Sequence, residues 1–595
     1  ERQLELHCEL GTDKLLVRRV TGHEFLGRLF EYQLTCYSLD ADVRLEALLG
    51  THASVRVRTA QSERFFDGMV VSCSSAGTRG RYALYQLTLK PWLWVLAQEQ
   101  NCRVFQRQTT LDIVKEVLAP HGLGPVSSSL SGSYKAREYC IQYRETELSF
   151  ISRLLEDEGI YYYFKHGLKQ HEWVLADDPA THVPAQGFER LHFVRLDDVG
   201  KVPGTVWDWS TTKQIEPGQV VLLDYDFEKP PADLRATGVS LTRHAHSNGE
   251  YFDYPGGYTD VTGAGEGEQR AKLRIQERVA KHEVFEAYTD ALGLAPGNLV
   301  ELMDHPRRDQ NRRYLVVGMR YEIDSGSFDS DGGGAAALVY RARTTLIDAK
   351  VQFRPARITR VPVIASAQTA TVVGPDNQEV EADEYGRVRV HFHWDRAGKG
   401  KPDSSCFVRV AQAWAGARYG AFFIPRIGQE VVVEFLEGDP DRPIITGCVY
   451  NANNKPPWNH PEQLSQSGWK TRSTKRANPD SYNELRFEDA KGKEEIHIQA
   501  ERDLTSKVKH DSAHEIKNKL TVNVLDSDYR TKVSKGNMLT EVKQLFEVQA
   551  GELLLKVGGS TIHMQSGSIT IEIGGSKIDL TAALMQLEGR TIKLN

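Results

Sequence analysis

The feature that most constrains this chain is an eight-residue repeat that runs from about Asp503 to its end. The repeat spaces three sets of residues: Gly551, Gly559, Gly567 and Gly575; Ser560, Ser568 and Ser576; and Val508, Ile516 and Val524. Eight residues provide one short strand and one tight corner, and glycine suits a corner because its φ is free of Cβ clashes. The repeat therefore predicts a β-solenoid with these glycines at its corners.

The repeat contains too little apolar side-chain volume to fill a core alone. Half of each strand is Lys, Glu, Asp, Ser or Thr, and no proline occurs after Asp503. Identical neighbours that wind together supply the missing core most simply, so we expect an intertwined oligomer. The inward face cannot be assigned, because the apolar residues change from even positions at Ile562 to odd ones at Ile569 and back at Ile578.

The rest of the 595-residue chain is long enough for several domains. Residues 1–365 are dominated by alternating segments such as 53–58 and 82–89, which predict half-buried strands. Residues 366–450 predict a small antiparallel barrel, because Arg387–Trp394 alternates between polar and apolar side chains. A connector, 451–480, then leads to the repeat region, 481–595. We therefore expect a mainly β protein of four parts.

Three helices are expected within the first part. Apolar stripes predict helices at 111–118, ended by Pro120, and at 148–155, stopped by Gly159 at C′. A third helix is predicted over 268–287. The stretch Asp329–Ala337 reads as a flexible surface loop, and Pro355–Pro362 as an interdomain joint.

Composition excludes some classes of protein. The net charge is −6, which indicates neither a nucleic-acid polycation nor an acidic tail, and no apolar run of 18 residues occurs. The seven cysteines are scattered and never form a C-x-x-C pair, so we expect reduced thiols rather than disulfides or a zinc site. The start at Glu1 shows no signal peptide and no initiator Met, so we expect a trimmed chain that folds in the cytoplasm.

Several motifs are specific enough to indicate a family. They are Gln368–Ala370, Val373–Pro375, Asp383–Val388, Phe392–Arg396, Pro425–Val431, Gly438–Pro443 and Gly447–Asn451, supported by Phe105–Gln106, Ser152–Phe164, Tyr254–Tyr258 and His305–Arg307. Together they resemble the VgrG (valine-glycine repeat) family of the type VI secretion system. The residues of the OB-fold motif that we single out are Pro425, Arg426, Gly428, Glu430, Gly438, Asp439, Pro440 and Asp441.

The resemblance implies an architecture and a function. It implies a homotrimer with two phage-hub-like β-barrels at 1–365, an OB-fold domain and a terminal triple-stranded β-helix. It implies a membrane-puncturing spike that sits on the Hcp tube hexamer among baseplate components, carries a PAAR-type tip protein or effectors, and is secreted by the machine without a signal peptide. A tail spike of a related contractile injection system is the alternative.

Two departures from the wider family bear on catalysis. The related phage spike has a lysozyme domain between its OB domain and β-helix, whereas only about 20 to 30 residues separate them here, which is far below domain size. Some family members carry a toxin domain after the β-helix, whereas this sequence ends at Ile592–Asn595 while still in the repeat, so either the protein stops there or the chain was cut. We therefore expect no enzymatic activity, no cofactor, and no catalytic or metal-binding residue.

Local clusters of polar residues offer weaker hypotheses. His391 and His393 lie on one strand face, which suits a metal, but a third ligand is not evident and a polar barrel face is the better interpretation. His510 and His514 fall in strand context and do not share a helical face. Glu156, Asp157 and Glu158 are adjacent on a helix, so we interpret them as a solvated, charged helix end rather than an acid–base pair.

Two rival functions remain to be weighed. Arg387, Arg389, His391 and His393 give the barrel a basic face, as in OB-fold proteins that bind nucleic acid, but Phe392 and Trp394 point to the opposite face and cannot stack on bases. We expect no nucleic-acid partner. A glycan-cleaving solenoid would need repeated acidic pairs, and the last octads offer Glu572 and Asp579 only singly.

Overall fold

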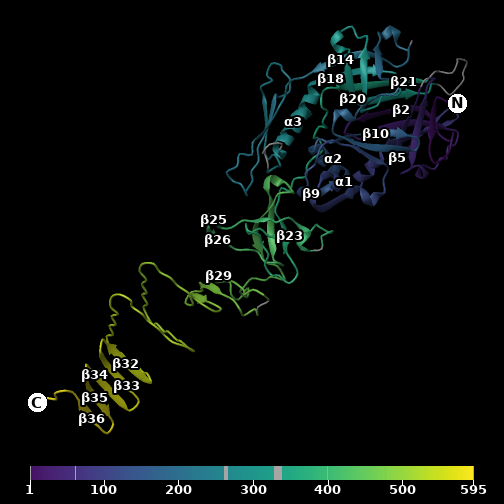
Figure 1. Ribbon diagram of the computed structural model, residues 1–595. Coiled ribbons are helices and arrows are strands. Elements are labelled where there is room, and N and C mark those ends of the chain that lie inside the picture. The colour runs from purple at the N-terminus through teal and green to yellow at the C-terminus, as the bar shows by residue number, and fades with distance from the viewer. Residues whose placement is uncertain are drawn as a thin grey trace. The chain divides into compact units, whose positions relative to one another are not determined.

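The computed structural model describes residues 2–60, 62–200, 202–259, 265–326, 338–398, 400–475 and 478–593. The chain divides into two compact units, Glu1–Asp503 and Leu504–Asn595. Strands are the main regular structure of both units, as Figure 1 shows, so the expectation of a mainly β chain is confirmed. The expected loop at Asp329–Ala337 lies outside the described residues.

A sheet of thirteen strands forms the body of the first unit. One half is the antiparallel run β1 (Leu4–His7), β4 (His52–Arg58), β5 (Glu63–Arg79), β6 (Tyr82–Lys90), β3 (Glu31–Ser38) and β2 (Leu16–Phe25). The other half is β20 (Arg313–Asp324), β21 (Val339–Asp348), β18 (Glu283–Thr289), β14 (Thr205–Lys213), β13 (Arg190–Phe193) and β19 (Asn298–Met303), beside the short β12 (Val183–Pro184). Because β19 also pairs with β20, the second half closes into a barrel.

Smaller sheets surround this body. They are β7 (Gln100–Gln108) with β9 (Arg137–Thr146); β10 (Tyr161–Gly167), β11 (Gln170–Ala176) and β8 (Val126–Ser129); and β16 (Ala236–Val239), β15 (Gln219–Leu222) and β17 (Glu250–Asp253). One large apolar cluster, with Tyr32, Phe66 and Trp173 fully buried, joins the first half of the sheet to the smaller sheets around it.

The three predicted helices are present. Helix α1 (Thr110–Leu118) begins with a capping box in which Thr109 and Asp112 bond reciprocally. Helix α2 (Glu147–Asp157) ends as predicted, because Gly159 has a φ of +70° and Ile160 N donates to Leu155 O. Helix α3 (Glu266–His282) ends five residues before the predicted Ala287, because residues 283–289 alternate in burial and pair as β18 with β14 and β21.

The OB part is a five-stranded sheet in the order β23 (Arg389–Phe392), β22 (Gln368–Val373), β27 (Glu430–Phe435), β28 (Pro443–Val449) and β24 (Arg409–Val410). Val388, Val390 and Phe392 are fully buried in its core, so the predicted alternation is confirmed. A separate hairpin, β25 (Trp414–Gly416) and β26 (Tyr419–Ala421), lies outside this sheet. The sheet β29 (Gln466–Lys470), β30 (Glu484–Glu488) and β31 (Glu495–Gln499) follows, with β29 inside the expected connector.

In the second unit, the octads fold back on each other. The strands β32 (Glu552–Val557), β33 (Ser560–Gln565), β34 (Ser568–Ile573), β35 (Ser576–Thr581) and β36 (Met585–Glu588) form an antiparallel meander. From β32 to β35, six strand residues and a two-residue turn make up each octad, so the period is explained. Residues 504–551 form no strand in the single chain, although we expected octads from 503 onward.

The corner glycines differ in their backbone φ angle. Gly567 and Gly575 have φ of +83° and +92°, as a glycine corner requires, but Gly551 and Gly559 do not have a positive φ. In the turn at 558–559 it is Gly558 that takes the positive φ, +57°. Gly559 thus lies in a turn, but its neighbour is the left-handed residue, because the turn type decides which of the two central residues is left-handed.

Candidate functional site: an acidic helix end at the joint between hub and OB domain

The last residues of α2 and the glycine turn after it lie where several parts of the first unit meet. Glu156, Asp157 and Glu158 follow one another, so their side chains leave the helix end in different directions. Each binds a different element of the fold. The interpretation of these acids as a solvated helix end is wrong, because arginines far away in the sequence fold over them and neutralise them.

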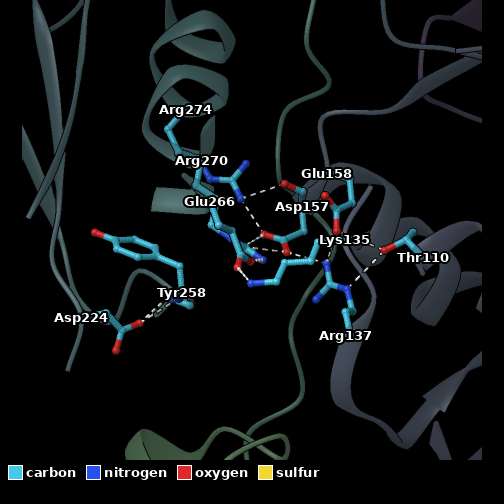
Figure 2. A network of polar contacts seen from close by, with 11 residues as sticks. Thr110, Lys135, Arg137, Asp157, Glu158, Asp224, Tyr258, Glu266, Arg270 and Arg274 are labelled. Carbon is cyan, nitrogen blue, oxygen red and sulfur yellow. Dashed lines mark hydrogen bonds and ion pairs between the residues drawn. The ribbon is translucent and has the colours of Figure 1, made fainter. Parts of the chain in front are cut away.

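Asp157 is surrounded by three arginines (Figure 2). Its carboxylate oxygens lie 2.8 Å from Arg137 Nη2, 3.0 Å from Arg270 Nη1 and 2.5 Å from Arg274 Nη2. Burial alone would raise the pKa of Asp157, but the guanidinium groups of Arg270, Arg137 and Arg274 together hold it well below its usual range. The ion cluster fastens α3 to the end of α2.

Glu158 and Glu266 extend this ion cluster on either side. Arg137 Nη2 also donates to Glu158 Oε1, at 2.9 Å, and Thr110 Oγ1 donates to the same oxygen from α1. On the other side, Arg270 Nε donates to Glu266 Oε1 at 3.2 Å. Arg137 and Arg270 thus each bridge two acids, and Figure 2 shows the row of alternating charges.

Glu156 holds the segment that leads to the OB domain. Only 4% of this residue is exposed. Its carboxylate accepts hydrogen bonds from the backbone N–H groups of Ile358 and Thr359, at 3.1 and 3.0 Å, and from Thr359 Oγ1 at 2.9 Å. Arg28 Nη1 lies 2.8 Å from the same carboxylate and supplies the opposite charge. The segment at 355–362, predicted as a joint, is thus a stretch without helix or strand that is bound to the hub.

The OB domain meets the hub through the loop that contains Gly438, Asp439, Pro440 and Asp441. Asp441 Oδ1 accepts the backbone N–H of Ile141 in β9, at 2.6 Å, and Asp439 Oδ1 accepts the N–H of Asp441 at 2.9 Å. Burial and the neighbouring Asp439 raise the pKa of Asp441 to about 7. This half of the predicted OB motif thus forms one of the contacts with the hub.

The other half of the motif lies near the exit from the OB domain. Gly428, with a φ of +87°, forms the turn before β27, and its N–H donates to Val372 O. Glu430 accepts from Asn451 Nδ2 at 2.8 Å. Arg426, which follows Pro425, donates from Nη2 to Arg472 O at 2.9 Å and so contacts the next sheet.

The candidate metal ligands have other partners. His391 Nε2 lies 3.0 Å from Asp395 O, and His393 Nε2 lies 3.0 Å from Thr369 Oγ1, so the two rings do not converge. Sequence reasoning missed a buried group, His52, Asp67 and His171, whose members lie far apart in the sequence.

That buried group does not fit a metal. The backbone N–H of Trp92 donates to His171 Nε2 at 3.0 Å, so Nδ1 carries the ring proton and donates to Asp67 Oδ2 at 2.8 Å. His52 Nδ1 lies 2.9 Å from the same oxygen, and Ser54 Oγ donates to the other. A second group consists of Glu99, His121 and Glu147. Its Glu147 carboxylate already pairs with Arg103, whose Nη2 lies 2.6 Å away.

Comparisons with known proteins match three successive regions. Residues 23–327 match the family described as phage tail baseplate hub (GPD), and residues 368–450 match the type VI secretion system/phage-baseplate injector OB domain. Residues 467–578 match the bacteriophage T4 gp5 C-terminal trimerisation domain. The fold and its joint therefore define a class of protein, the baseplate hub that continues into an injector OB domain and a trimerisation domain.

Individual relatives place the chain within this class. The type VI secretion system spike protein VgrG1a of Pseudomonas aeruginosa is 42% identical over 513 residues, which cover 86% of this chain and 79% of that protein. This chain belongs to the VgrG family of type VI secretion system spike proteins. Within the described residues, no helix is long and apolar enough to cross a membrane.

Solved structures agree in fold. An E. coli protein, c3393, described as a type VI secretion component similar to the T4 tail proteins gp27 and gp5, superposes with a TM-score of 0.53 at 21% identity, over 75% of this chain and 99% of that one. A chain of the Francisella PdpA-VgrG complex gives a TM-score of 0.53 at 8% identity, over 84% of this chain and 88% of that one.

Proposed function

We propose that three copies of this chain form the spike of a type VI secretion machine, with the octad regions wound into one β-helical shaft. One observation carries this proposal. Between Leu504 and Lys593 no described residue is buried, and large apolar side chains such as Leu525 and Leu539 are almost fully exposed. A chain cannot leave such side chains in water when identical neighbours can cover them. The match to a trimerisation domain supports three copies.

The joint described above would transmit force within each copy. A contracting machine pushes on the hub, and the OB domain and shaft must move with it. Several contacts connect the hub with the OB domain and the segment before it, among them Glu156 to residues 358–359 and Asp441 to β9. Since a polar joint must break several hydrogen bonds together before it yields, it is suited to carry an axial load.

The partners follow from the same architecture. The hub end would sit on the Hcp tube hexamer within the baseplate, and the shaft would carry a PAAR-type tip protein or effectors into the target cell. A Francisella VgrG was solved together with PdpA, which supports a protein cargo or partner. The chain would be made in the cytoplasm and exported by the machine itself. Boundaries at 365, 450 and 480 separate the four proposed parts.

The proposed role is mechanical rather than enzymatic. The acids of α2 are neutralised by arginines, and Asp67 is bound by His171, the half-buried His52 and Ser54. In these two described clusters each carboxylate already has cationic or hydrogen-bonding partners, which makes it a poor proton acceptor for a substrate. Delivery would therefore depend on shape, stiffness and cargo.

A secretion assay tests this function. A strain that lacks its own copies of this gene should release no Hcp into the medium, and the full chain should restore release. Removal of residues 504–595 should abolish restoration, while Asp309→Asn, an exposed hub substitution, should leave it intact. Full Hcp release without residues 504–595 would contradict the spike role.

A further inference from the structure

The hairpin β25–β26 of the OB domain and the two residues after it carry an unusual amount of exposed aromatic surface. Trp414, Tyr419, Phe422 and Phe423 are 60–64% exposed, and Trp414 and Tyr419 pack edge-to-face against each other with ring centroids 5.5 Å apart. Aromatic side chains bury about 150–250 Å² each when they are covered. Four together exceed the scattered apolar exposure that is normal on a protein surface.

The hairpin is also poorly supported by its own domain. Its two strands pair only with each other among the described strands, and they form no part of the five-stranded OB sheet. A lone two-stranded hairpin is at best marginally stable in water. Its base is nevertheless fixed, because Gln412 Oε1 accepts the N–H of Phe423 at 2.9 Å and Gln412 Nε2 donates to Phe423 O at 3.0 Å. Because the base is fixed while the aromatic side chains are exposed, we expect another protein chain to cover these side chains.

Charge and local geometry agree with a protein partner. Arg418, at the turn, is the only charged residue between Ala411 and Pro425. Depletion of charge together with enrichment in aromatic residues is typical of the centre of a protein interface. Gly416 lies beneath the ring of Tyr419, where a Cβ would come within 2.4 Å of it, so the sequence leaves room for this aromatic arrangement.

The position of the hairpin identifies the partner. Its C-terminal flank reaches Arg426, which donates to Arg472 O between β29 and β30, within the region that matches the trimerisation domain. That neighbouring sheet carries its own exposed apolar residues, Trp469, Ile496 and Ile498. The aromatic surface thus lies beside the region that matches the trimerisation domain.

We infer that the β25–β26 hairpin is a trimer contact of the OB domain, whose aromatic tip packs against the next copy of the same chain. This inference rests on the trimer proposed above and deepens it. In a ring with threefold symmetry such a contact is head-to-tail, so each hairpin contacts a different surface of its neighbour. The OB domains would then hold the copies together independently of the shaft.

Photo-crosslinking of the full chain tests the inference. p-Benzoylphenylalanine replaces Tyr419 in one sample and Leu39, an exposed hub residue, in the control. Ultraviolet light should give covalent dimers and trimers from the position-419 sample on a denaturing gel, and only background from the position-39 sample. Absence of covalent oligomers at position 419 in a sample whose native mass is trimeric overturns the hairpin contact, while the trimer itself stands.

A charge substitution gives a second readout. Trp414→Glu places an unpaired charge in the inferred contact, and each tenfold loss of association corresponds to about 1.4 kcal/mol. We expect at least about tenfold more dissociated chain at the same total concentration. Leu196→Glu, at an exposed hub position, is the matched control and should not dissociate the trimer. Equal dissociation of the two variants, or none in either, contradicts the inference.

Discussion

At the scale of single residues, the chain is held together by acids whose partners come from distant parts of the sequence. Asp157 sits next to two other acids, and nothing in that local sequence indicates Arg270 and Arg274, which α3 brings to it. The sequence predicted the helix and its glycine stop, because these depend on neighbouring residues. It could not predict the environment of the acids, because that depends on how the elements pack.

Asp157→Asn should destabilise the hub. The change removes the one carboxylate that three arginines share and leaves their charges partly unpaired, with only 25% of the Asp157 side chain exposed. We expect a loss of about 2–4 kcal/mol in the free energy of unfolding, measured by urea denaturation. Asp309→Asn is the control, because the ion pair of Asp309 with Arg307 is 61% exposed on the acid side and such pairs contribute about 0–1 kcal/mol. Equal losses in the two variants would show that the cluster has no special role.

Asp441 should make stability depend on pH in the sense opposite to an ordinary ion-paired acid. Its pKa is raised to about 7 in the folded chain, so the folded state holds a proton that the unfolded state releases near pH 4. The contribution of protonated Asp441 to the free energy of unfolding is therefore fully present below about pH 4 and is lost as the pH rises through 7. Asp441→Asn should reduce the decrease in stability between pH 5 and pH 8.

The control for Asp441→Asn is the same substitution at an exposed acid of the same domain. Asp403→Asn, at an exposed position, should keep the pH dependence of the unmodified chain. Thermal unfolding at a series of pH values measures both variants. An unchanged slope in Asp441→Asn would mean that the carboxylate is ionised in the folded joint.

At the scale of elements, the joint segment and the octad turns show how local geometry serves the assembly. The sequence predicted a joint near 355–362 from its prolines, but it did not predict that Glu156 binds this segment. Glu156 binds backbone N–H groups of the segment, and these are present whatever the side chains are. The octad period predicted turns, but not which glycine is left-handed. That choice depends on the turn type, which two adjacent glycines leave open.

Glu156→Gln should loosen the joint segment. The amide cannot form the ion pair with Arg28, and it accepts the N–H groups of Ile358 and Thr359 more weakly than a carboxylate does. Trypsin should then cut faster after Arg357 or Arg360, giving one fragment on each side of the joint. Glu158→Gln, two residues away but bound to Arg137, should leave the rate unchanged. Equal cleavage of the two variants would exclude the clamp.

Gly567→Val should weaken the octad region more than Gly559→Val. Both glycines have open space around the position of a Cβ, so the two variants differ mainly in φ, which is +83° at Gly567 and not positive at Gly559. The strain at Gly567 should cost about 1–3 kcal/mol per chain. Resistance of the trimer to heat in detergent is the measurement. Equal resistance would show that the left-handed turn is not kept in the assembled shaft.

At the scale of the whole molecule, the sequence predicted the class of protein because its motifs are local and its repeat is periodic. It predicted an unfilled core in the repeat, and the second unit confirms that no described residue there is buried. The inward and outward faces of the shaft could not be predicted, since they depend on where other copies lie. The exposed apolar side chains of the single chain indicate that other copies cover them, but they do not indicate where those copies lie.

The central claim is that the chain functions as a trimer, and native mass spectrometry of the purified full chain tests it most directly. One chain has a mass of 66.9 kDa. At micromolar concentration we predict a single species at three times that mass, because only association covers the apolar side chains between Leu504 and Lys593. A folded, soluble species at 66.9 kDa under the same conditions would contradict the account.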